Sequence, residues 1–127
     1  MPPRTPPRFA QIVLALAGLN YSLTGLALLL APLWFYENIG HFPPFNRHYA
    51  GDLGTFLLPL GLGLLIAARD PTKHRLFIGV AAGASVLHAL NHLYDTLLEP
   101  SASHLLPETI VLFLFAGALL LTLRVKP

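Results

Sequence analysis

The chain has 127 residues, enough for one domain, but 54% of them are hydrophobic and only 11% are charged. This composition differs strongly from that of soluble proteins, so we expect an integral membrane protein. The absence of cysteine from the sequence excludes disulfides, thiolate metal ligands and thiol redox chemistry. The net charge is +2. In a membrane protein, basic residues serve to set the orientation in the bilayer. The positive charge is explained in this way, and we expect no nucleic-acid partner.

Long apolar segments predict membrane-spanning helices, since about 20 apolar residues cross a bilayer. We expect four, at about residues 9–33, 49–68, 75–98 and 107–124. Residues 9–127 would then form one all-α domain, a four-helix transmembrane bundle whose partner is the lipid bilayer. Residues 1–8 are basic and proline-rich, which predicts a disordered N-terminus.

The basic residues are distributed unequally between the two sides of this bundle. Only Arg47 falls on one side, and the opposite side holds Arg4, Arg8, Arg69, Lys73, Arg75, Arg124 and Lys126. The positive-inside rule therefore predicts that both termini are cytoplasmic, in a multi-pass protein of the cell inner (plasma) membrane.

The first two spans each place polar residues where lipid-facing residues are the norm. Asn20, beside Tyr21 at the centre of the first span, is expected to face the bundle, and an interhelical hydrogen bond is its ordinary role. The aromatic loop 32–48 is typical of an interfacial belt, with a lid over a lipid-soluble ligand as the alternative. In the second span, Asp52 shares a face with His48.

The third span carries the densest polar pattern. At about 100° per residue, its polar residues share one helix face, and they are His88, Asn91, His92, Asp95 and Glu99. The same azimuth carries Ala81, Ala84 and Ser85 in the inner half, where small residues allow close packing. This combination predicts a blind polar pocket that opens outward.

Several functions fit such a pocket. The predicted ligand-binding residues are Asn20, Asp52, His88, Asn91, His92 and Asp95, supported by His48, Glu99, Glu108 and Tyr21. One possibility is a small amphiphile, such as a quinone or a lipid-like molecule, bound by its polar head.

A divalent metal is the other candidate ligand. The i, i+4 spacing of His88 and His92, followed by Asp95, suits Zn, Fe(II) or Mn if Asp52 completes the shell. Haem is disfavoured, because no other predicted helix has a mid-membrane histidine to match His88.

Two other classes stay open. In the first, the polar face packs against a homo-oligomer or a membrane-complex partner, as in an accessory subunit. In the second, a membrane enzyme of the oxidoreductase type would use His92 or Asp95 as acid or base, with Asp52 as an orienting group. No nucleophile or cofactor motif supports the enzyme.

The layout resembles that of the DoxX-like small bacterial membrane proteins. The resemblance rests on four helices, a long first outer loop, the segment Asn46–Gly54 at the start of the second span, and the Leu/Gly run at residues 57–63. It implies the four-helix fold. Some members of the wider group are linked to quinone-coupled sulfur oxidation, while many have no assigned activity, so the resemblance implies little about chemistry here. The run from His88 to Asp95 does not match the group's pattern.

Overall fold

The computed structural model describes residues 8–99 and 105–124, and these residues are helical with no strand among them. The helices are α1 (Arg8–Leu30), α2 (Pro32–Asn38), α3 (Arg47–Ala67), α4 (Arg75–Leu98) and α5 (Leu105–Thr122). All but the short α2 are long and apolar enough to cross a membrane. The all-α, multi-span prediction is confirmed at this level. The prediction of disorder for residues 1–7 falls outside the described residues, and Arg8 already begins α1.

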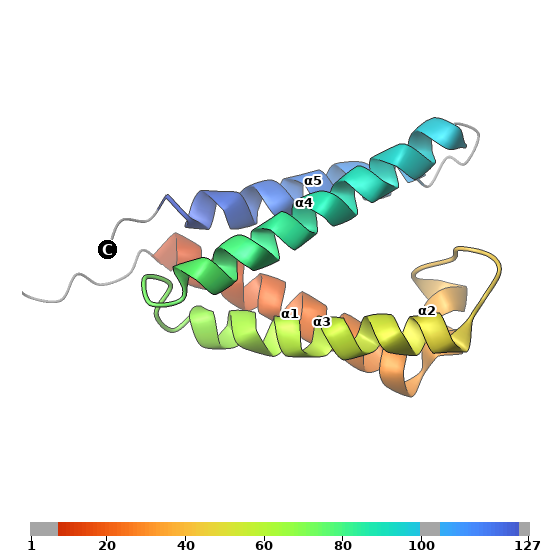
Figure 1. Ribbon diagram of the computed structural model, residues 1–127, viewed down its shortest axis with the longest axis horizontal. Coiled ribbons are helices and arrows are strands. Elements are labelled where there is room, and N and C mark those ends of the chain that lie inside the picture. The colour runs from red at the N-terminus through yellow and green to blue at the C-terminus, as the bar shows by residue number, and fades with distance from the viewer. Residues whose placement is uncertain (1–7, 100–104, 125–127) are drawn as a thin grey trace, which may run out of the picture.

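The long helices associate as two antiparallel pairs, α1 with α3 and α4 with α5 (Figure 1). The pairs meet at the end that holds Arg8, the α3–α4 connection and Arg124, and they diverge towards the other end (Figure 1). We call these the closed end and the open end. The hydrophobic core lies towards the closed end, where residues from all four long helices pack together, among them Leu14, Leu64, Ile78, Ala81 and Leu119.

Glycines hold α1 and α3 in close contact. A Cβ on Gly61 would lie 2.4 Å from the backbone nitrogen of Ser22, and one on Gly25 would lie 2.6 Å from that of Leu58. Both distances are far below van der Waals contact, so only glycine permits this approach. Gly18, Ser22 and Gly25 therefore form the close-packing surface of α1.

The connection between α1 and α3 is more ordered than the sequence suggested. The first span ends at Leu30 rather than residue 33, since Pro32 restricts Ala31 and starts α2. The loop after α2 folds back on it, with the Tyr36 ring 4.5 Å from that of His41 and 5.2 Å from that of Phe45.

The cap of α3 also differs from the expected start of the second span. The Asn46 side chain accepts hydrogen bonds from the backbone of His48 and Tyr49, at 2.9 and 3.2 Å. This N-cap fixes the first residue of α3 at Arg47 rather than at residue 49.

Candidate functional site

One hydrogen bond joins the two helix pairs at the boundary between the closed end and the region where the pairs diverge. The Tyr21 hydroxyl of α1 lies 2.7 Å from the Ser85 hydroxyl of α4, and both residues are buried. The Tyr21 ring also packs edge-on against Phe115 of α5, with 5.5 Å between centroids. This contact between α1, α4 and α5 forms the floor of the region where the pairs diverge.

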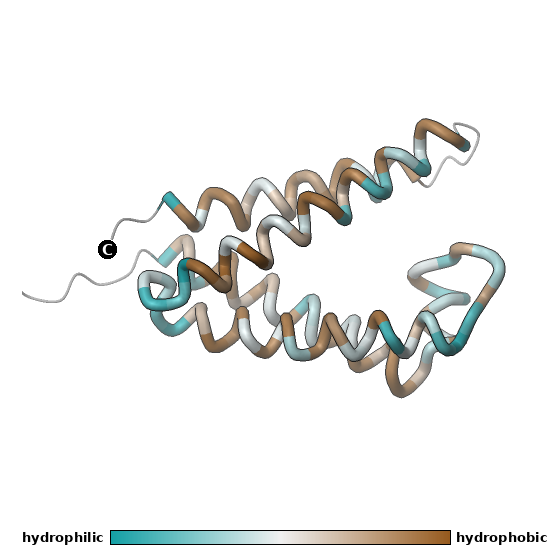
Figure 2. Tube along the Cα trace, in the orientation of Figure 1, coloured by the Kyte–Doolittle hydropathy of each residue, from teal (hydrophilic) through white to brown (hydrophobic). Residues whose placement is uncertain are grey.

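Above this floor, hydrophilic residues interrupt the apolar length of α4 (Figure 2). The His88 and His92 rings are in edge-on contact, with centroids 4.9 Å apart. One turn further, the Asn91 amide donates to the Asp95 carboxylate at 3.3 Å. The four residues of the predicted common face therefore form two contacting pairs along α4.

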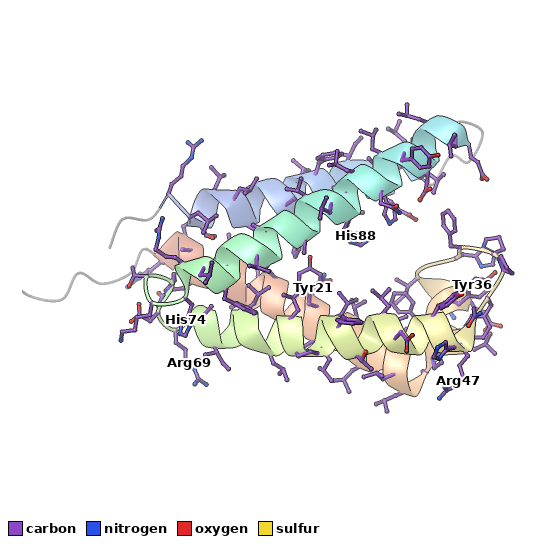
Figure 3. The ribbon with its side chains drawn as sticks, viewed as in Figure 1. Tyr21, Tyr36, Arg47, Arg69, His74 and His88 are labelled. Carbon is purple, nitrogen blue, oxygen red and sulfur yellow. The ribbon has the colours of Figure 1, made fainter. Side chains whose placement is uncertain are left out.

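Burial changes sharply along the faces that the two pairs turn towards each other. Ala81 is fully buried, whereas His88, seven residues or two turns further along α4, is exposed. On α3, Leu64 is fully buried, whereas Leu53, three turns nearer the open end, is 50% exposed. His88 projects from α4 towards the α1–α3 pair (Figure 3). The divergence thus uncovers both inner faces.

A second set of polar contacts joins α4 to α5. The hydroxyls of Thr96 and Thr109 lie 2.9 Å apart. The Nδ1 atom of His92 lies 3.8 Å from a carboxylate oxygen of Glu108, which is too far for a hydrogen bond. This buried nitrogen has no hydrogen-bond partner among the described residues. Glu108, predicted as a supporting residue, therefore does lie beside the polar face of α4.

Other predicted residues lie apart from this group. Asp52 is exposed on α3 and lies 3.4 Å from Nε2 of His48, one turn earlier. Asn20 was expected to face the bundle, but it is exposed, roughly opposite the glycine face of α1. Glu99 is exposed at the C-cap of α4.

The predicted metal shell is not assembled. Residues 8–99 and 105–124 contain no group of three or more His, Asp or Glu side chains placed to hold a metal ion. Asp52, which was expected to complete the shell from α3, instead pairs with His48. The site residues that the structure brings together are His88, Asn91, His92 and Asp95, with Glu108 beside them and Tyr21 below.

Three further residues of the site were not singled out as such from the sequence. The sequence pattern predicts Ser85 to be a small packing residue, yet its hydroxyl bonds Tyr21 and also donates to the Ala81 carbonyl at 2.8 Å. Thr96 and Thr109 were not noted. Thr96 lies one turn beyond His92, and its hydroxyl donates to the His92 carbonyl at 2.8 Å. The i, i+4 spacing of His92 and Thr96 is the sequence signal that places Thr96 on the same face.

No protein-family model, curated protein or solved structure matches this chain. The resemblance to the DoxX-like group therefore stays a prediction, and function has to be argued from the site alone.

Proposed function

We propose that the protein binds a small amphiphile with an uncharged polar head, such as a quinone, between the α1–α3 and α4–α5 pairs at the open end. The observation that carries this proposal is that His88, exposed directly above the buried Ser85, projects from α4 towards the α1–α3 pair, and that Asn91, also exposed, lies about 60° from it around the helix. Polar side chains at membrane depth are costly unless they are paired or solvated, and they commonly mark a binding site.

The side chains suit a head with carbonyl or hydroxyl groups. A neutral imidazole offers one N–H donor and one acceptor, and an asparagine amide offers both as well. His88 and Asn91 can therefore each bind one oxygen of the head. Apolar residues uncovered by the divergence, such as Leu53, suit the tail of the molecule, as in most ligand sites.

A metal ion is not part of this proposal. His88, His92 and Asp95 all come from one helix, and although the Glu108 carboxylate of α5 lies 3.8 Å from His92, the described residues contain no group of three or more such side chains placed to hold a metal ion. An amphiphile needs only the hydrogen bonds that the exposed polar groups offer. The proposal assigns no reaction to the site.

The proposal includes an orientation in the membrane. The closed end holds five of the six described basic residues, namely Arg8, Arg69, Lys73, Arg75 and Arg124, and only Arg47 lies at the open end. By the positive-inside rule, the closed end and both termini face the cytoplasm of a bacterial inner membrane, and the site opens to the outer leaflet.

The single tryptophan of the chain provides a direct test. Trp34 lies in α2 at the open end and is 53% exposed, and benzoquinones quench indole fluorescence. Titrating a decyl-substituted benzoquinone into the full chain in detergent should quench Trp34 saturably. Since a net hydrogen bond is worth about 1 kcal/mol, His88→Leu should weaken binding about fivefold.

His74→Leu is the matched control, because His74 lies at the closed end (Figure 3). Its titration should coincide with that of the wild type. Quenching that rises linearly, without saturation, and is the same in all three proteins reports only partition of the quinone into detergent, and it would overturn the proposal.

A further inference from the structure

A groove on the membrane-facing surface lies at the closed end, far from the polar face of α4. It runs along the last turns of α5 beside the start of α1, with a volume of about 590 Å³. Its apolar lining includes Phe9, Phe113, Leu114, Gly117, Ala118 and Leu121. A Cβ on Gly117 would meet nothing within 4 Å, so no side chain of residues 8–99 or 105–124 fills the groove there.

The length of the groove matches one leaflet of a bilayer. From Phe113 to its end at Thr122, α5 rises about 14 Å at 1.5 Å per residue, which is about half of the roughly 30 Å hydrocarbon core. A single acyl chain from one leaflet would lie along such a groove, with its head at the level of Arg124.

The groove ends in a positive charge. Arg124 lines it, is exposed, and forms no ion pair with any described residue. Arg8, also exposed, directly precedes Phe9 of the lining. Among the described residues, the only acid at this end is Asp70, and it is paired with Lys73 at 2.9 Å. An anionic head is thus complementary to the mouth of the groove.

We propose that this groove binds one anionic phospholipid, with an acyl chain along Gly117 and Ala118 and the phosphate head at Arg124. The site is independent of the amphiphile site at the open end, because the two share no residues.

Native mass spectrometry of the full chain, with added phosphatidylglycerol or phosphatidylcholine of identical acyl chains, tests this assignment. The wild type should bind one phosphatidylglycerol more tightly than phosphatidylcholine. Since one interfacial arginine is worth about a fivefold change in affinity for an anionic lipid, Arg124→Gln should remove most of this preference.

Two matched glycine variants test the groove itself. Gly117→Leu places a side chain in the groove, where an added Cβ meets nothing within 4 Å, and should weaken the binding of both lipids. Gly83→Leu on α4 also enters open space, but Gly83 does not line the groove, so lipid binding should stay as in the wild type. Far-UV circular dichroism checks that both variants keep their helices.

Three results would overturn the proposal. One is equal binding of the two lipids by the wild type, and another is equal lipid binding by Gly117→Leu and Gly83→Leu. The third is a change from oligomer to monomer in Gly117→Leu with lipid binding unaltered, which would assign the groove to a second copy of the chain.

Discussion

Removing the two partners of the Tyr21–Ser85 hydrogen bond one at a time should have unequal effects on stability. The Ser85 hydroxyl has one proton and donates it to the Ala81 carbonyl, so the Tyr21 hydroxyl is the donor in the bond between the helix pairs. Tyr21→Phe leaves Ser85 with its Ala81 partner, and the ring contact with Phe115 is kept. We expect a cost of about 0.6 kcal/mol, the average for an interhelical hydrogen bond in a membrane.

Ser85→Ala instead leaves the Tyr21 hydroxyl buried without an acceptor, which costs about 1–3 kcal/mol. The double variant has no unpaired hydroxyl and should be more stable than Ser85→Ala alone. Reversible unfolding in mixed detergent micelles, followed by far-UV circular dichroism, measures all four proteins. If Tyr21→Phe costs as much as Ser85→Ala, the assigned direction of the hydrogen bond is wrong.

Two other predictions concern the packing of α1 on α3 and the loop at the closed end. Gly61→Ala should destabilise the protein by about 1–3 kcal/mol through overpacking against backbone atoms. Gly83→Ala, whose added Cβ meets nothing within 4 Å, should be neutral or slightly stabilising in the same unfolding assay. Equal effects of the two substitutions would refute the close approach of α1 and α3. Hydrogen bonds from Thr72 and Lys73 lower the pKa of Asp70 to about 2 from its ordinary 3.8. The stabilisation by Asp70 should therefore be complete well above the ordinary pKa and disappear as the pH falls towards 2. The difference in unfolding free energy between wild type and Asp70→Asn should be constant above about pH 5 and shrink in acid. A constant difference down to about pH 2 would contradict this assignment.

The sequence was sufficient to predict the four long helices, since their apolar length is a local property. It was also sufficient for the polar face of α4, because His88 and His92 meet through helix periodicity alone. Element boundaries depended on single residues. Pro32 ended the first span early, and the Asn46 cap started α3 two residues before the expected position.

Relations between helices were harder to predict. Asn20 was assigned to the bundle interior because it is polar, but the glycine face of α1 lies roughly opposite, and close packing through Gly25 and Gly61 determines which side α3 occupies. The sequence pattern offers Asp52 as the carboxylate from another helix that completes the shell of His88 and His92. A sequence pattern does not specify the distance between helices that diverge, and Asp52 instead meets His48 on its own helix.

The central claim is that the inner face of α4 is accessible above Ser85 and faces the space between the helix pairs. Because the chain has no cysteine, single-cysteine variants can be labelled with a membrane-impermeant maleimide in intact spheroplasts. We predict that Asn91→Cys reacts from the outside, that the decyl-substituted benzoquinone slows this reaction, and that Ser85→Cys is protected. An unreactive Asn91→Cys, or one that reacts only after the cytoplasmic side is opened to the reagent, would contradict the account.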